Sequence, residues 1–280
     1  MRNADDTIEE SEGGAHMVHY TLGFIGTGGI TSFMVRGLCS APEFTGRIIL
    51  SVHKHVEKPN ELRALAPERI SLSHSNQEIV DAADIVFIAV LPNQHEQVVS
   101  ALHFREGQRI IQITGGVKLS DAMHLYKPAT AARAIPLPFA ARRKGPILLY
   151  GGDNACREVM SLMGSIVDVH SEEEFAVLGP VTGMMVPYYA LLAEYVKWGI
   201  ARGLSFRTVL DYAAYMNEAL SSFMRTDCTE DTEKFLRDNS TPGGVNELGL
   251  KLMREYGAYE LWSKTLDALY DKYNSMGKSN

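Results

Sequence analysis

The first residues suited to chemistry form a glycine turn, Gly26-Thr-Gly-Gly-Ile30. The turn follows the apolar run 22–25 and precedes residues 33–38, which can form the inner face of a helix. A strand, a glycine turn and a helix in this order let backbone N–H groups approach a pyrophosphate. Thr31 stands where a third glycine would allow the closest packing of helix on strand. The residues predicted to bind a dinucleotide are Gly26, Thr27, Gly28, Gly29 and Ile30, and an ordinary glycine turn is the alternative.

The residues after the second predicted strand bear on which dinucleotide is bound. An Asp or Glu there would hydrogen-bond the adenosine ribose and repel a 2′-phosphate. The chain instead has Ser51-Val-His-Lys-His55, which offers a hydroxyl, a cation and two imidazoles to a phosphate dianion. Ser51, His53 and Lys54 therefore predict a preference for NADP(H), with NAD(H) as the second choice. The alternative is a solvated loop, which is common for charged residues on connections.

A second candidate site is the segment Ser240-Thr-Pro-Gly-Gly-Val-Asn246. A Pro-Gly-Gly turn that opens into a helix presents free N–H groups and the positive end of the helix dipole, which suit a small carboxylate. Ser240, Thr241 and Asn246 add short polar side chains around this turn. The alternative is a connection between two helices in which Asn246 serves as the N-cap.

The elements that would position the glycine turn alternate along the chain between short apolar runs and helical segments. Such alternation predicts a sheet of buried parallel strands. We expect strands at residues 22–25, 47–52, 84–90, 109–114, 131–135, 147–150 and 166–169, and helices or helical turns at 61–65, 76–82, 94–102 and 154–163. Val90, Leu91, Pro92, Thr114 and Gly115 are also assigned to the cofactor site. An α/β domain that binds no nucleotide is the alternative.

After about residue 170 the pattern changes to long segments with a period of 3.6 residues. We expect a largely buried helix at 185–202 entered through Pro187, a helix capped by Ser205, and helices at 229–237, 246–256 and 259–273, the last two separated by Gly257. The predicted fold class is α/β, with an N-terminal Rossmann-type dinucleotide-binding domain followed by an all-α C-terminal dimerisation domain. The expected boundaries are a disordered tail at 1–17, the dinucleotide-binding domain at 18–170, and the helical substrate and dimerisation domain at 171–280.

Composition excludes several other classes of protein. The chain has 280 residues, 45% of them hydrophobic, which is ample for buried cores in two domains. A formal charge of -7 argues against binding to a nucleic-acid duplex. Cys39, Cys156 and Cys228 are widely spaced and odd in number, which favours neither a disulfide framework nor a metal site and indicates a reducing compartment. We expect no membrane span and no targeting peptide, and hence a cytoplasmic protein.

Several local motifs together resemble the pyrroline-5-carboxylate reductase family, over residues 20–273. They are Gly23-Phe-Ile-Gly-Thr-Gly28 with Arg36-Gly-Leu38, the run Ala83-Asp-Ile-Val-Phe-Ile-Ala-Val-Leu-Pro92, Arg133-Ala-Ile-Pro136, Pro187 with Tyr189, and Ser240-Thr-Pro-Gly-Gly-Val-Asn246. The resemblance implies reduction of a small-molecule cyclic imine to an amine with NAD(P)H. It also implies homodimers, or multiples of them, whose helical domains interlock.

The resemblance further implies that residues 241–246 help to hold the substrate carboxylate and ring nitrogen. Thr241 and Asn246 are the candidate catalytic residues, and the substrate-binding residues are Pro242, Gly243, Gly244, Val245 and Asn246. Tyr188 and Tyr189 are outside candidates for the proton, although aromatic residues on an apolar helix usually pack in a core.

The departures from the family pattern lie where substrate would sit. The family has Lys where this chain has Leu91, an Asn where it has Leu137, and Thr where it has Asn246. The bulky Met184-Met-Val186 replaces a Gly-Ser-Gly sequence. Larger apolar groups reject substrates by steric exclusion, and a lost polar partner changes which substituents can be buried. We therefore expect pyrroline-5-carboxylate itself to be a poor substrate.

Two other functions remain open. A β-hydroxyacid dehydrogenase shares the two-domain plan but requires a catalytic Lys with an Asn one helical turn later, whereas Lys197 is followed at that spacing by Ala201. Its neighbours Tyr195 and Trp198 do not match that motif either. A protein that binds NADP(H) without catalysis, as a redox-responsive or structural partner, is the alternative outside the enzyme class.

Overall fold

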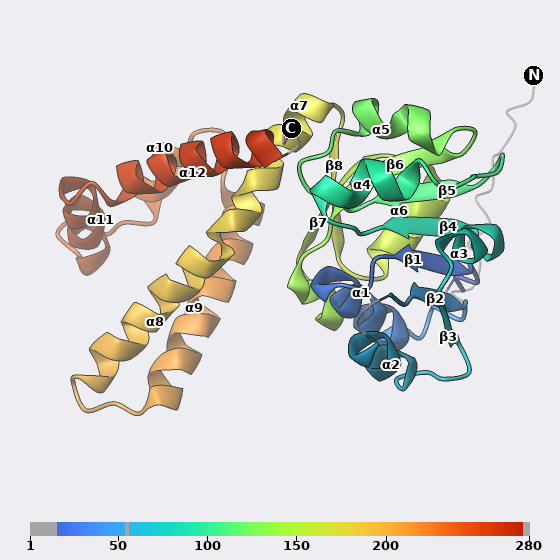
Figure 1. The fold of residues 1–280 in the computed structure, drawn as a ribbon. Coiled ribbons are helices and arrows are strands. Elements are labelled where there is room, and N and C mark those ends of the chain that lie inside the picture. The colour runs from blue at the N-terminus through green and yellow to red at the C-terminus, as the bar shows by residue number, and fades with distance from the viewer. Residues whose placement is uncertain (1–15, 54–55, 277–280) are drawn as a thin grey trace, which may run out of the picture. The chain divides into compact units, whose positions relative to one another are not determined.

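The computed structural model describes residues 16–53 and 56–276, and the chain divides into two compact units (Figure 1). The first unit comprises Met1–Phe175 with Ser275–Asn280, and the second is Ala176–Asn274. This division falls five residues after the boundary expected at residue 170. The predicted tail, residues 1–17, lies outside the described residues except for its last two.

The first unit is built on a sheet whose order is β3-β2-β1-β4-β5-β6-β7-β8. The strands are β1 Leu22–Ile25, β2 Ile48–Ser51, β3 Ile70–Ser73, β4 Ile85–Ile88, β5 Arg109–Gln112, β6 Thr130–Ile135, β7 Pro146–Gly151 and β8 Ser165–Val169. Neighbouring strands are parallel except for β6 and β7, which are antiparallel. The order from β3 to β6 is that of the doubly wound Rossmann sheet, which confirms the predicted fold class.

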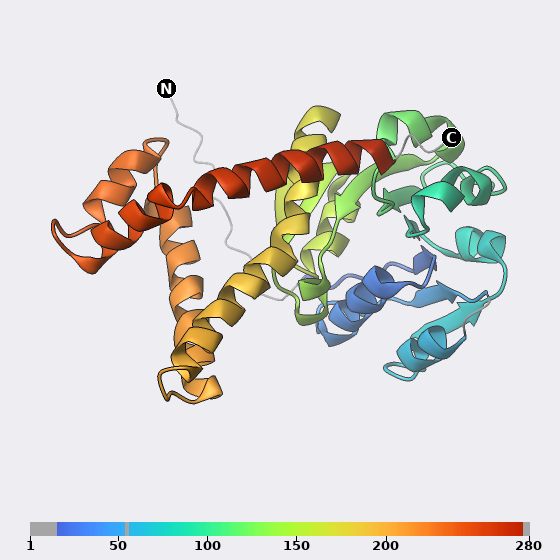
Figure 2. The ribbon, with the colours of Figure 1, turned by 60° about the vertical axis from the view of Figure 1, so that its left-hand side comes forward.

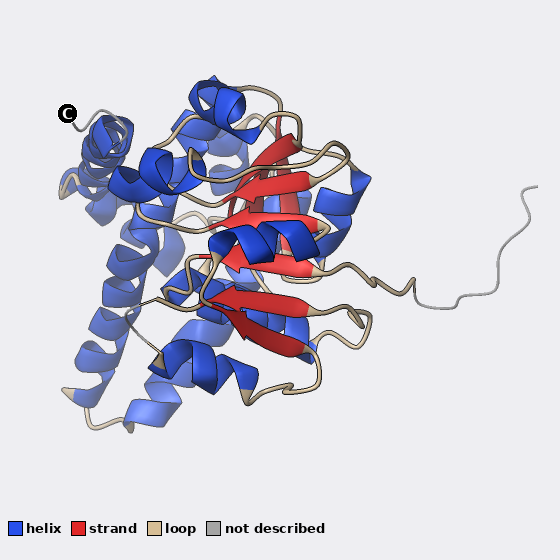
Figure 3. Cartoon of the chain, turned by 45° about the vertical axis from the view of Figure 1, so that its right-hand side comes forward, coloured by secondary structure: helices blue, strands red, loops and turns tan. Residues whose placement is uncertain are grey.

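Helices cover both faces of this sheet (Figure 3). They are α1 Gly29–Ser40, α2 Glu57–Arg63, α3 Asn76–Ala82, α4 Pro92–Val99, α5 Leu119–Tyr126, α6 Asn154–Ser161 and α7 Glu172–Leu178, with a 3₁₀ helix, η1, at Pro138–Arg142. α4 begins two residues before the predicted start because Pro92 takes a first-turn position, where its missing N–H costs nothing. Helix α3 has the predicted bounds, and the Ser75 hydroxyl caps it by accepting from the Glu78 N–H.

Two apolar layers form the core of the first unit, one on each face of the sheet. Along β4, Ile85 and Phe87 point into one layer and Val86 and Ile88 into the other. Phe87 stacks on Phe24 of β1 with ring centroids 4.4 Å apart. Because both faces are covered, the strands are continuously apolar, and that is the pattern from which they were predicted.

The second unit is entirely helical (Figure 2). It contains the 3₁₀ helix η2 at Gly179–Met184 and the α-helices α8 Met185–Ile200, α9 Phe206–Asp227, α10 Thr232–Asp238, α11 Val245–Glu255 and α12 Ala258–Ser275, the last residue of which belongs to the first unit. The predicted N-cap is confirmed, because the Ser205 hydroxyl accepts from the Thr208 N–H at 3.1 Å. Gly257 separates α11 from α12 with a φ of 68°, which a glycine adopts without strain.

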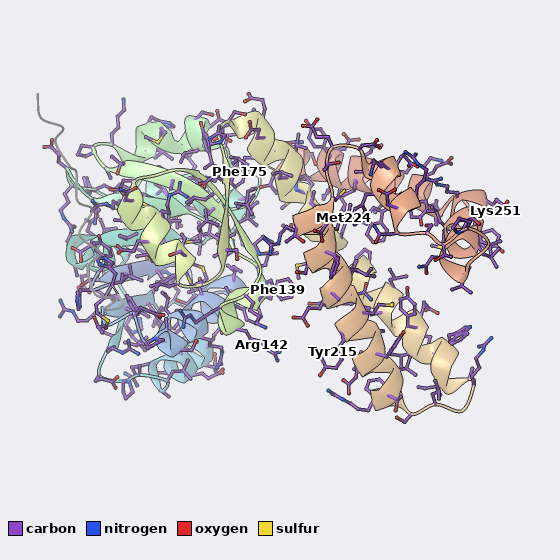
Figure 4. All side chains as sticks on the ribbon, turned by 180° about the vertical axis from the view of Figure 1, so that it is seen from behind. Phe139, Arg142, Phe175, Tyr215, Met224 and Lys251 are labelled. Atoms are coloured by element: carbon purple, nitrogen blue, oxygen red, sulfur yellow. The ribbon has the colours of Figure 1, made fainter. Side chains whose placement is uncertain are left out.

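The expectation that residues 185–202 form a largely buried helix is wrong for this chain alone. The buried residues of α8 are Val196 and Gly199, whereas Tyr189 and Trp198 are exposed. Helix α9 likewise exposes Tyr215 and Met224, which Figure 4 labels. An apolar stripe predicts that one face of a helix is buried, but it does not show whether that face packs against the same chain or against another molecule.

The expectation that no stretch is long enough to span a membrane is also wrong by length and composition. The continuous helical stretch Glu172–Ile200 meets both criteria. Length and composition do not distinguish a helix in lipid from an apolar helix that packs against protein.

Candidate active site

The glycine turn between β1 and α1 has two kinds of glycine. Gly26 has a φ of 101°, and a Cβ built on it would lie 2.5 Å from the Ala89 carbonyl oxygen, so the fold itself requires glycine there. A Cβ at Gly28 or Gly29 would have no heavy atom of the described residues within 4 Å. The fold therefore does not require these two glycines, and the space beside them is open to a ligand.

Three hydrogen bonds fix the shape of this turn. The Gly26 N–H donates to the Ser51 hydroxyl at 2.9 Å, and the Thr27 hydroxyl donates to the Ser51 carbonyl at 2.7 Å. The Thr31 hydroxyl, fully buried, donates back to the Gly26 carbonyl at 2.7 Å. Thr31 thus occupies the third glycine position of the motif by bonding to the turn instead of leaving space.

Ser51 is buried, with an exposed fraction of 2%, and its hydroxyl and carbonyl oxygens bond to the glycine turn. The contact with a 2′-phosphate therefore remains a prediction for the exposed His53 and for Lys54. Lys54 and His55 lie outside the described residues. No acidic residue stands between the end of β2 and His53.

The N-terminus of α1 is available to an anion. Gly28 is its N-cap and has no side-chain capping bond from the described residues, and the first turn contains no acid. The Ser32 N–H donates to the Gly28 carbonyl at 3.1 Å. The preceding N–H groups of the turn point along the axis of a 12-residue helix, and they and the helix dipole favour negative charge.

Loops after β4 and β5 complete this edge of the sheet. Thr114 follows β5 and donates its hydroxyl to the Val90 carbonyl at 3.1 Å, tying the two loops together. Leu91, the N-cap of α4, is 62% exposed, and a Cβ at Gly115 would meet open space among the described residues. The carboxyl ends of β1, β2, β4 and β5 meet here because the four strands are parallel neighbours. The structure thus gathers the described residues of the predicted cofactor site at the point where the strand order reverses.

The second predicted site is the bend between α10 and α11. Gly243 has a φ of 72°, its N–H donates to Glu247 Oε2 at 2.7 Å, and the Gly244 N–H donates to the Thr241 carbonyl at 2.9 Å. The N-cap of α11 is Gly244, so the alternative that made Asn246 the N-cap is wrong. Asn246 is the second residue of the helix and is exposed.

A cavity of about 530 Å³ adjoins this bend. Ser240, Pro242 and Glu247 line it, together with charged residues that no sequence motif singled out: Glu233, Arg237, Lys251, Arg254 and Glu255. Figure 4 marks Lys251 on α11. Of these lining residues, Glu247 could have been predicted from the sequence. It lies three residues after the N-cap Gly244, and an acid at that spacing commonly reaches back to a free N–H.

The remaining candidates have structural partners or lie apart. The Tyr188 hydroxyl donates to Asn217 Oδ1 at 2.9 Å, whereas the hydroxyl of the exposed Tyr189 has no hydrogen bond to a described residue. Lys197 pairs with Glu194 at 2.6 Å on the surface of α8, which does not favour a dehydrogenase lysine. Among the described residues no group of three or more His, Cys, Asp or Glu could hold a metal ion.

Comparisons with known proteins agree with this geometry. Residues 21–116 match the model of a family described as NADP oxidoreductase, coenzyme F420-dependent. The pea pyrroline-5-carboxylate reductase is 23% identical over 247 residues, covering 85% of this chain and 89% of the pea protein. The solved structure of the Streptococcus pyogenes pyrroline-5-carboxylate reductase has a TM-score of 0.78 at 22% identity, covering 92% of this chain and 99% of that one. The Plasmodium falciparum pyrroline carboxylate reductase, solved with NADP bound, has a TM-score of 0.76 at 16% identity, with coverage of 93% and 99%.

An open glycine turn on a Rossmann sheet, followed by a helical unit, defines the class of two-part dinucleotide-dependent oxidoreductases. The similarity to the curated relatives extends over both units. Within that class, the chain is similar over most of its length to pyrroline-5-carboxylate reductases, which agrees with the resemblance found from its motifs.

Proposed function

We propose that this protein reduces the C=N bond of a cyclic imine to an amine, with NADPH as the hydride donor. The observation that carries the proposal is the uncapped turn at Gly28, which leaves an anion site open at the N-terminus of α1. The names of the relatives that match both units supply the reaction class.

Hydride transfer to an imine needs the imine carbon at about 3 to 3.5 Å from C4 of the nicotinamide, in a pocket from which water is excluded. The electrophile is the protonated iminium, so a side chain or a bound water must supply a proton. Thr241 and Asn246 would orient the ring nitrogen and an attached carboxylate. Asn246 cannot itself act as an acid. Tyr189 is a better candidate for the proton donor than Tyr188, because the Tyr188 hydroxyl already donates to Asn217.

The experiment that tests this function is a scan of cyclic imines in which the loss of NADPH absorbance is followed. The panel contains pyrroline-5-carboxylate, pyrroline-2-carboxylate, piperideine carboxylates and uncharged pyrrolines. We expect turnover on at least one imine and poor turnover of pyrroline-5-carboxylate, because Leu91, Leu137 and Met184 replace polar or small residues. Tight NADPH binding without turnover on any imine would instead favour a non-catalytic NADP(H)-binding protein.

Asn246→Ala should lower kcat/KM about 10-fold to 100-fold, the cost of one hydrogen bond to a charged group. NADPH affinity should not change, because Asn246 lies in the helical unit. A matched control is Asn274→Ala on α12, whose amide bonds to its own helix at the Tyr270 carbonyl. Steady-state kinetics with the best imine of the panel measure both variants, and unchanged turnover in Asn246→Ala would remove this residue from the site.

NADPH should bind about 10-fold more tightly than NADH, a difference of about 1.4 kcal/mol. The reason is that no acid follows β2 to repel a 2′-phosphate, while Lys54 and the neighbouring histidines can attract it. Fluorescence titration with both reduced cofactors measures the ratio. Lys54→Ala should weaken NADPH and leave NADH unaffected, and tighter NADH binding by the wild type would refute the preference.

The exposed aromatic residues of α8 and α9 support a homodimer as the working assembly. A second copy would cover side chains such as Trp198 and Phe223, which are 59% and 63% exposed. A cytoplasmic location suits the free cysteines of the described residues. Light scattering gives the molar mass in solution, and a monomer there would contradict this assembly.

A further inference from the structure

Three polar side chains from different elements lie buried in the first unit. Gln112 ends β5, Tyr126 ends α5, and His95 lies in the first turn of α4. Gln112 and Tyr126 have no exposed surface and His95 has 3%. No sequence motif singled them out, and the proposed reaction does not use them directly.

Hydrogen bonds fix the direction of this Gln112–Tyr126–His95 chain. Gln112 Nε2 donates to the Val117 carbonyl at 2.7 Å, which turns Oε1 towards Tyr126. The Tyr126 hydroxyl donates to that Oε1 at 2.8 Å. Its oxygen can then only accept from His95 Nε2, 2.7 Å away, so the proton of the neutral imidazole is on Nε2. Burial lowers the pKa of His95 and raises that of Tyr126, which keeps both groups neutral.

Helices α4 and α5 share one apolar cluster, to which Val99 of α4 and Ala122 of α5 belong. A polar cavity of about 290 Å³ lies beside them, lined among others by Asn93, His95 and Glu96 of α4 and by Asp121 and His124 of α5. The hydrogen-bonded chain runs beside this cavity and connects the two helices, and the ring of Phe104 packs edge-on against Tyr126. Buried polar groups cost stability unless all of them are satisfied, so such a chain specifies one geometry.

That geometry fixes the two loops beside the glycine turn. Val117 closes the loop after β5, and His95 follows Pro92, which begins α4. The bond from Thr114 to the Val90 carbonyl connects the same two loops closer to the sheet. The loops after β4 and β5 are therefore joined twice, once at the edge of the sheet and once through the buried chain.

We propose that Gln112, Tyr126 and His95 are positioning residues for the nicotinamide half of NADPH. They hold residues 90–92 and 114–117 in the conformation that receives the nicotinamide and its ribose, while the glycine turn holds the pyrophosphate. This inference rests on the proposed function. If one of these hydrogen bonds is lost, the two loops spend less time in the conformation that binds the cofactor. The apparent affinity for NADPH then falls in proportion to the population of that conformation.

The test is Tyr126→Phe, which removes one oxygen and keeps the ring. We expect the Kd for NADPH to rise about 10-fold, because His95 and Gln112 lose their common partner. The Kd for 2′,5′-ADP, which carries the adenine half without nicotinamide, should stay within about 2-fold because it does not use these loops. The matched control is Tyr150→Phe on β7, whose hydroxyl bonds to no described residue, and it should change neither constant.

A second variant, His95→Leu, serves if Tyr126→Phe does not fold, and the double variant should lose less than the sum of the two single losses. Equal weakening of NADPH and 2′,5′-ADP, or no weakening of either, would overturn the positioning role and leave the proposed function intact. A wild-type protein that binds 2′,5′-ADP but not NADPH would overturn the proposed function and this inference with it.

Discussion

Gly28→Asp should fold as the wild type does and bind NADPH about 100-fold more weakly. A Cβ at position 28 meets open space among the described residues, so the new side chain causes no clash. Aspartate is also a favoured N-cap and would satisfy the free N–H groups of α1. Its carboxylate would then occupy the place of the pyrophosphate and repel it. Unit charges about 4 Å apart near a protein surface repel by about 4 kcal/mol, and screening by salt reduces this to the roughly 2.8 kcal/mol that a 100-fold loss requires.

The contrasting variant is Gly26→Ala, in which the new Cβ would lie 2.5 Å from the Ala89 carbonyl oxygen at a φ of 101°. We expect this change to lower the stability of the fold, whereas Gly28→Asp should leave it unchanged. Thermal unfolding and NADPH titration on both proteins separate the two effects. Wild-type affinity in Gly28→Asp would show that the pyrophosphate does not bind at this turn.

Glu172→Gln should reduce the free energy of unfolding by about 3 kcal/mol. Glu172 Oε2 accepts from Arg133 at 2.8 Å, and Oε1 accepts the N–H groups of Leu119 and Ser120 at 2.6 and 3.3 Å. The Arg133 side chain is only 3% exposed and that of Glu172 only 11%. The Arg133 guanidinium also lies over the Phe175 ring. Glutamine keeps the size of Glu172 but removes its charge and one acceptor oxygen from this buried cluster.

Urea unfolding measures the loss in Glu172→Gln. The control is Asp238→Asn, which neutralises an exposed pair with Lys234 on α10 and should cost less than about 0.5 kcal/mol. A Glu172→Gln protein as stable as the control would mean that the cluster contributes little and that α7 is held by the apolar contacts of Phe175.

Much of the first unit could be predicted from local sequence. The apolar run of β4 is buried on both faces, so continuous hydrophobicity was sufficient to locate it. Strand β3 was missed because Ile70-Ser-Leu-Ser73 lies at the edge of the sheet and only Ile70 is buried. Helix α5 was not predicted because it has only eight residues, too few for the spacing of its buried Leu119, Ala122 and Tyr126 to stand out as a helical period.

The candidate site divides in the same way. The glycine turn is a local motif, and its residues could be predicted. The support that Ser51 gives to Gly26 joins positions 25 residues apart, and the bond between His95 and Tyr126 joins positions 31 apart. No periodicity encodes such contacts. The burial of α8 was predicted wrongly for a related reason, since its apolar face is not covered within this chain.

The most direct measurement of the central claim is the transfer of deuterium from NADPH deuterated at the reactive C4 position. With the best imine of the panel, the amine product should carry one deuterium at the former C=N carbon, as mass spectrometry and NMR would detect. An amine without deuterium, or oxidation of NADPH with no amine formed, would contradict hydride transfer from NADPH to a C=N bond.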